Sequence, residues 1–130
     1  MLERTSFREG LRYRGGASMR AWMLHRLTGL GVLLFLSIHI VETFTLSLGP
    51  DFYNHTMELY NTVFFRVAEI VLLFAVLYHA INGTRITVQD FWPALWRHEH
   101  VLVWVGFAIL IVVFIPLAIL GLLPVIRGEL

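Results

Sequence analysis

The sequence contains no cysteine, which excludes disulfides and thiolate metal sites. It also has little charge, since 15% of its 130 residues are charged and 58% are hydrophobic. Soluble domains are usually about 45–50% apolar, so this excess indicates a protein that faces lipid. Residues 1–130 are too few for more than one ordinary domain. The formal net charge of +1 says little about partners, and we expect no nucleic-acid partner.

Three segments are apolar and long enough to cross a bilayer, which takes about 20 helical residues. We place them at about residues 21–48, 62–83 and 100–124, after a cytoplasmic arm at residues 1–20. The third is the clearest, because residues 101–123 contain no charged side chain. The sequence therefore predicts an all-α integral membrane protein with three transmembrane helices.

The arginines predict the orientation of these helices. All ten basic residues are arginine, and six of them lie in the first 26 positions. The loop at residues 49–61 has none, whereas the loop at residues 83–99 has Arg85 and Arg97. Basic residues are concentrated on the cytoplasmic side of membrane proteins. We therefore expect a cytoplasmic N-terminus and a C-terminus on the outer face.

Two histidines lie within the predicted spans, where a polar side chain usually faces a partner or a cofactor. Histidine is a common axial ligand of haem iron. At 1.5 Å per residue, His79 lies roughly 5 Å below the inner boundary, whereas His39 lies much deeper in its own span. One iron cannot reach both, so two ligands would mean two haems, each with its second ligand from another chain. The alternative is that each imidazole only bonds a neighbouring helix.

Other polar residues lie where the spans meet the cytoplasmic side. His25 and Arg26 could bond a quinone carbonyl or a haem propionate, or could simply anchor the first span. Arg85, expected just past the end of the second span, could bond a propionate or be an ordinary loop arginine. Ser18 could cap the first helix or bond a ligand.

Two motifs resemble a known family. The segment Leu-His-Arg-Leu-Thr-Gly at residues 24–29 resembles the His-Arg-x-[Ser/Thr]-Gly signature of the cytochrome b membrane anchor of succinate dehydrogenase. The segment His-Ala-Ile-Asn-Gly-Thr-Arg at residues 79–85, followed by Asp90, resembles the second signature of that family, His-x-x-x-Gly-x-Arg-x-x-x-x-Asp. Both motifs stand at the family's places, entering the first span and leaving the second. Length and topology match too, so the resemblance covers nearly the whole chain.

The resemblance implies roles for individual residues. It makes His79 an axial ligand of haem b and Arg85 a propionate partner. It places Arg26 and His25 in the surroundings of the quinone and the propionates. The family's quinone-contacting serine corresponds to Trp22 here, so the quinone pocket is expected to differ, with Ser18 as a substitute.

His39 departs from the one-haem members of the family. Two-haem members carry a histidine in the outer half of this span, and residues 37–42 look like theirs. The chain is in this respect similar to actinobacterial and related types that use menaquinone. The resemblance therefore implies a second haem b at His39 and menaquinone as the electron acceptor.

The resemblance also implies a complex in the bacterial inner membrane. A flavoprotein oxidises succinate, an iron–sulfur subunit relays electrons, and two small anchors in the lipid bind haem and quinone. This chain carries no flavin or iron–sulfur motif, so we expect it to be an enzyme subunit without catalytic residues, passing electrons to quinone. The alternatives are a haem-free structural anchor, a cytochrome b subunit of another membrane oxidoreductase, and a small transporter subunit.

Overall fold

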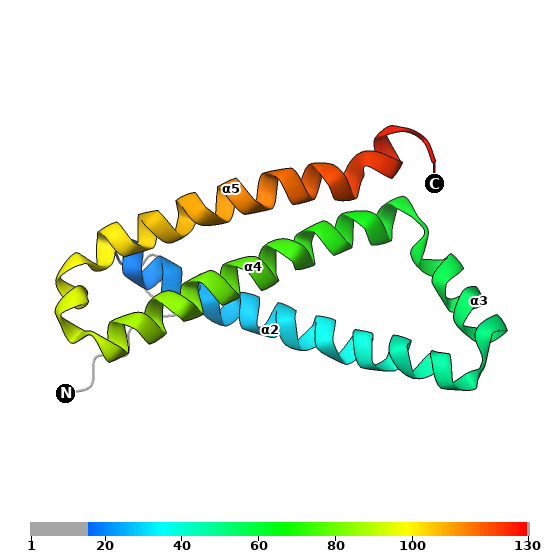
Figure 1. Ribbon diagram of the computed structural model, residues 1–130, viewed down its shortest axis with the longest axis horizontal. Helices are drawn as coiled ribbons and strands as arrows, with labels where there is room; N and C mark the ends of the chain where they lie inside the picture. The colour runs from blue at the N-terminus through cyan, green and yellow to red at the C-terminus, as the bar shows by residue number, and fades with distance from the viewer. Residues whose placement is uncertain (1–15, 130) are drawn as a thin grey trace, which may run out of the picture.

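The computed structural model describes residues 16–129, which are helical almost throughout and contain no strand. Three long helices are joined by short helical connections (Figure 1). In chain order the elements are α2 (Ala17–Phe44), η1 (Thr45–Leu48), α3 (Pro50–Tyr60), α4 (Val63–Phe91), η2 (Pro93–His98) and α5 (Glu99–Ile126).

Helix α4 is the centre of the arrangement, because it packs against both α2 and α5. Figure 1 shows α2 and α4 close together near the start of α2 and apart at their other ends, where α3 joins them. Three glycines lie in the interfaces of α2 with α4: Gly29 faces His79, Gly31 faces Ala75, and Gly83 faces His25. Small residues let membrane helices approach closely. Gly29 and Gly83 therefore affect how closely His25 and His79 can approach each other.

The helix boundaries follow from local sequence. Gly49 has φ of +111°, which favours glycine, and Pro50 then opens α3 at the position where a missing N–H is harmless. The hydroxyl of Thr62 accepts a hydrogen bond from the backbone N–H of Phe65 and so caps α4. Helix α4 ends before Pro93, because the residue that precedes a proline is disfavoured in the helical conformation.

Few side chains are buried within the chain, and large apolar residues are exposed along all three long helices. Each of these helices is long and apolar enough to cross a membrane. A bilayer provides an apolar environment for such surfaces, whereas water would not. The prediction of an all-α, multi-pass membrane protein is confirmed.

Two local expectations were wrong. Helix α4 runs on to Phe91, so Arg85 lies inside the helix and not past its end. No proline interrupts α4 between residues 83 and 91, since the next proline after Pro50 is Pro93. Ser18 does not cap α2: the cap position is Gly16, without a side-chain bond, and Ser18 is already in the first turn. The polar connection expected at residues 49–61 is present and contains a helix, α3, at residues 50–60.

The start of α2 and the connection between α4 and α5 lie at one end of the molecule, as expected when three successive helices cross a membrane (Figure 1). The start of α2 lies beside the start of α5, where the Ser18 hydroxyl donates a hydrogen bond to Glu99 Oε2 at 3.1 Å. Helix α3 and the end of α5 lie at the opposite end (Figure 1). Which end faces the cytoplasm stays a prediction, and the arginines at positions 4, 8, 12 and 14 lie outside the described residues.

Candidate cofactor site

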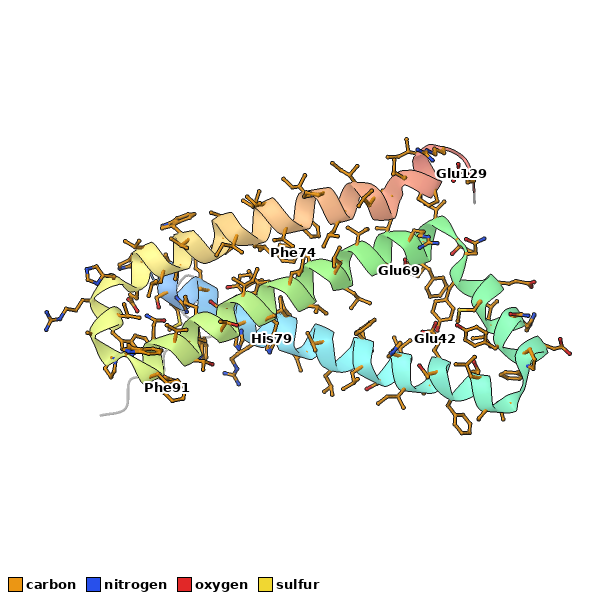
Figure 2. The ribbon with its side chains drawn as sticks, in the orientation of Figure 1. Glu42, Glu69, Phe74, His79, Phe91 and Glu129 are labelled. Atoms are coloured by element: carbon orange, nitrogen blue, oxygen red, sulfur yellow. The ribbon has the colours of Figure 1, made fainter. Side chains whose placement is uncertain are left out.

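The crossing of α2 and α4 brings two sequence-predicted residues into contact. The imidazole rings of His25 and His79 are stacked, with centroids 4.0 Å apart and an interplanar angle of 5°. In addition, His79 Nδ1 lies 3.1 Å from the backbone oxygen of His25. Figure 2 shows His79 at this crossing, on α4 where it passes α2. The two motifs, 54 residues apart in sequence, therefore form one site.

The contact to the carbonyl selects the tautomer of the His79 ring. A carbonyl oxygen only accepts, so Nδ1 must carry the hydrogen and donate it. In the neutral imidazole, Nε2 then holds a free lone pair. This is the arrangement found in metal-ligating histidines, whose second nitrogen donates to a carbonyl or carboxylate. Nε2 makes no hydrogen bond to any residue between 16 and 129, so it is available to a ligand.

Glycine at position 29 makes room for the His79 ring. A Cβ at Gly29 would lie 3.1 Å from Cε1 and 3.5 Å from Nδ1 of His79. The first distance is tighter than ordinary van der Waals contact, so a side chain there would push the imidazole away from α2. Glycine at position 83 has a similar but weaker role, since its Cβ would lie 3.4 Å from Cε1 of His25.

Tyr78 also contributes to the contact between α2 and α4, and the sequence analysis does not single it out. Its side chain is 4% exposed, and its hydroxyl donates a 2.8 Å hydrogen bond to the backbone oxygen of Ala21. The His25 oxygen, one turn further along α2, is held by His79. Two adjacent residues of α4 thus bond two successive turns of α2. The available signal was a tyrosine inside a span, whose hydroxyl needs a partner when buried.

Arg85 lies on the same helix, two turns beyond Tyr78, with Nε and Nη1 buried and without a hydrogen-bond partner among the described residues. It lines a small cavity between α4 and α5 together with Tyr78 and Asn82. A buried guanidinium without an acceptor is costly, so Arg85 is placed to receive one. Asp90 is exposed near the end of α4.

The four proposed quinone contacts are only partly brought together. Arg26 lies over the Trp22 ring, with Cζ 4.8 Å from its centroid, and both side chains are exposed. His25 instead faces α4. Ser18 donates its hydroxyl hydrogen to Glu99 on α5. Ser18 would therefore have to release Glu99 before it could donate to a quinone carbonyl.

His39 lies far from this site. It stands fourteen positions after His25 on α2, which is about 21 Å along a helix with a rise of 1.5 Å per residue. It is exposed and lines a cavity of about 1150 Å³ between the diverging halves of α2 and α4, closed at one end by α3. Its Nδ1 lies 3.9 Å from Glu42 Oε2. A shared iron with His79 is therefore excluded by distance.

The cavity at His39 has a mixed lining. Apolar residues of α2 and α4, such as Phe35 and Leu72, form most of its walls. Glu42 on α2 and Glu69 on α4 face the gap from its two sides (Figure 2). Within residues 16–129, no three His, Asp or Glu side chains gather in a way that could hold a metal ion.

Three apolar spanning helices, with polar side chains gathered at one helix crossing, define a small polytopic membrane protein. Residues 2–121 match the family of succinate dehydrogenase/fumarate reductase transmembrane subunits, and the chain belongs to this family. It is thus a membrane anchor subunit of a succinate dehydrogenase complex. The complex as a whole is an oxidoreductase. The predicted family and membrane location are confirmed.

Two relatives are similar over much of the chain. The succinate dehydrogenase 2 membrane subunit SdhC of Mycobacterium tuberculosis is 32% identical over 104 residues, covering 80% of this chain and 76% of the relative. The succinate dehydrogenase hydrophobic membrane anchor subunit of Halobacterium salinarum is 33% identical over 75 residues, covering 57% of this chain and 58% of the relative. Family membership argues against the transporter alternative.

Proposed function

We propose that this anchor binds haem b through His79 Nε2 and passes electrons from an iron–sulfur subunit to a membrane quinone. The proposal rests on the hydrogen bond from His79 Nδ1 to the His25 carbonyl. Because Nδ1 carries the hydrogen, Nε2 of the neutral ring has a lone pair that can bind a metal. The donor set fits the group: a neutral imidazole suits iron, and a buried guanidinium suits a propionate. Bound haem supplies a one-electron carrier.

The chain's own residues would orient the haem. His25 covers one face of the His79 ring, and Tyr78 holds α4 against α2 beside it. Arg85 Nη2, which makes no hydrogen bond to a described residue, is the nitrogen we assign to a propionate. This chain would hold the haem through one histidine at the crossing, so a second protein ligand would come from a second anchor subunit.

The quinone would be bound at the exposed Arg26 and Trp22, with His25 behind them. A quinone carbonyl accepts hydrogen bonds, and both the guanidinium and the indole N–H donate them. Ser18 is the weaker candidate because its hydrogen is already donated to Glu99. The exposed apolar faces of α2 and α5 leave room for lipid and for the partner subunits, which we propose to be an iron–sulfur protein, a flavoprotein and the second anchor.

A second haem b at His39 completes the proposal. The adjoining cavity of about 1150 Å³ exceeds the roughly 300–1,000 Å³ of ordinary ligand pockets, so a group as large as haem has room there. With two haems the electrons would cross the membrane in two steps. We propose menaquinone as the acceptor.

His79→Ala in the purified whole complex tests the proposal. We expect loss of the low-spin b-type absorption of the haem at the crossing and about one haem fewer per flavin. His55→Ala on the exposed face of α3 is the matched control and should leave the spectrum unchanged. A wild-type complex with flavin but no b-type absorption would support the haem-free anchor instead.

A further inference from the structure

The buried side of α4 changes from apolar to polar along its length. Tyr78, Asn82, Arg85 and Gln89 follow each other at intervals of three or four residues, so they lie on one face of the helix. Asn82 is 6% exposed and Gln89 is fully buried. Polar groups in such positions of a membrane protein are costly and usually mark a binding site.

The Tyr78 hydroxyl donates to Ala21, but the other three side chains of this face carry hydrogen-bonding atoms without partners among the described residues. Asn82 Nδ2, Arg85 Nε and Nη1, and both side-chain polar atoms of Gln89 are buried without a partner among the described residues. A buried donor that loses its hydrogen bond costs about 1–3 kcal/mol. The unpartnered atoms of Asn82 and Arg85 are all donors, so whatever binds them must be an acceptor.

Asn82 and Arg85 line a small cavity. It has a volume of about 10 Å³ between α4 and α5 and is lined by Asn82 and Arg85 on one side and by Val103, Gly106 and Phe107 on the other. A water molecule needs about 10–15 Å³ and two to four polar partners. The cavity therefore has the size of one water, whereas a larger anion would not fit it.

Gly106 keeps this cavity open. A Cβ at this position would have a single neighbour within 4 Å, Ile81 Cγ2 at 3.5 Å, which is an ordinary contact. A methyl group can therefore be added at Gly106 without strain. It would take up space that is otherwise available to a small molecule.

We propose that one ordered water molecule occupies this cavity and accepts hydrogen bonds from Asn82 Nδ2 and from the Arg85 guanidinium. The water partly solvates the buried charge of Arg85 from the α5 side, which leaves Nη2 for another ligand. The site is formed by α4 and α5 alone. It does not include the histidine pair, and it shares Arg85 with the haem site proposed above.

Gly106→Ala in the whole complex tests the water site by the sign of a stability change. If the cavity holds water, the methyl group displaces it, the donors lose their acceptor, and the temperature of thermal unfolding falls. If the cavity is dry, the same methyl group adds apolar contacts and the temperature rises or stays unchanged, which would overturn the proposal. Gly16→Ala, whose Cβ would meet only His100 at 3.7 Å, is the matched control.

Asn82→Leu provides a second measurement. Replacing an unsatisfied amide by an apolar side chain of similar size is neutral or stabilising, whereas replacing one that binds water is destabilising because Arg85 loses its bridge. We also expect a density map of the complex that resolves water to show a peak within hydrogen-bond distance of both side chains. A propionate oxygen, a partner side chain or a residue of this chain in that place would refute the water site.

Discussion

The imidazole of His25 lies parallel to that of His79, 4.0 Å away, and the backbone oxygen of the same His25 binds His79 Nδ1 at 3.1 Å. One residue therefore limits the rotation of the His79 ring and selects its tautomer. Histidine ligands are commonly oriented by such outer contacts. In the proposed haem site, the first motif would thus support the ligand that the second motif offers.

Gly29 is the position where this support is most sensitive to size. In Gly29→Ala the new methyl group would lie 3.1 Å from His79 Cε1, so the imidazole has to move by a few tenths of an ångström. We expect lower haem content or a shifted reduced spectrum in the purified complex, with intact assembly. Gly16→Ala should leave both unchanged. Normal haem content and potential in Gly29→Ala would mean that the ring position does not matter.

Tyr78→Phe removes the hydroxyl that joins α4 to α2 while keeping the buried ring. The Tyr78 hydroxyl donates a 2.8 Å hydrogen bond to Ala21, and such a bond contributes about 0.5–1.5 kcal/mol. We expect the thermal unfolding of the complex to shift down by a corresponding amount and the haem spectrum to change slightly. Tyr53→Phe, in α3 at the far end of the molecule, is a suitable control. Equal effects of both substitutions would contradict a specific role for Tyr78.

Hydropathy and arginine placement predicted three spans because each span had to be apolar over about 20 residues. The two motifs predicted that His25 and His79 belong to one site, and the structure brings them into contact. The hydrogen bond that orients His79 could not be predicted, because it ends on a backbone oxygen whose position depends on how α2 and α4 cross. The sequence predicts the end of α4 too early, because Arg85 and Asp90 are typical of a loop, whereas the helix extends past the hydrocarbon core, where charged residues are acceptable.

Asn82 and Gln89 illustrate a second limit. Both are buried, and Asn82 borders a cavity against α5, but burial of this kind depends on how the helices pack and cannot be predicted from the local sequence. Ser18 was proposed as a cap or ligand contact, yet its partner is Glu99, 81 residues away. Contacts of this kind follow from tertiary packing and leave no local pattern.

Arg26→Ala tests the quinone contact. The guanidinium lies over Trp22 on an exposed face of α2 and would donate to a quinone carbonyl. We expect quinone reduction to fall at least tenfold, while succinate oxidation with a soluble dye stays normal because the dye accepts electrons before the membrane subunits. Arg97→Ala, which removes an exposed charge in η2, is the matched control. If quinone reduction is normal in Arg26→Ala, the arginine is only a membrane anchor.

His39→Ala tests the second haem. An imidazole in the middle of a span has no water to bond, and His39 faces a large cavity with Glu42 at its edge. We expect wild-type complex to contain two haems per flavin and His39→Ala to contain one, with the spectrum of the His79 haem preserved. Menaquinone is a weaker oxidant than ubiquinone, so electron transfer to it could draw on the membrane potential, worth about 2.3 kcal/mol per charge per 100 mV. His39→Ala should therefore also lose any dependence of succinate oxidation on that potential. His55→Ala controls for removal of an exposed histidine at the same end of the molecule. One haem per flavin in the wild type, together with an unchanged spectrum in His39→Ala, would mean that His39 bonds a helix of the partner anchor instead.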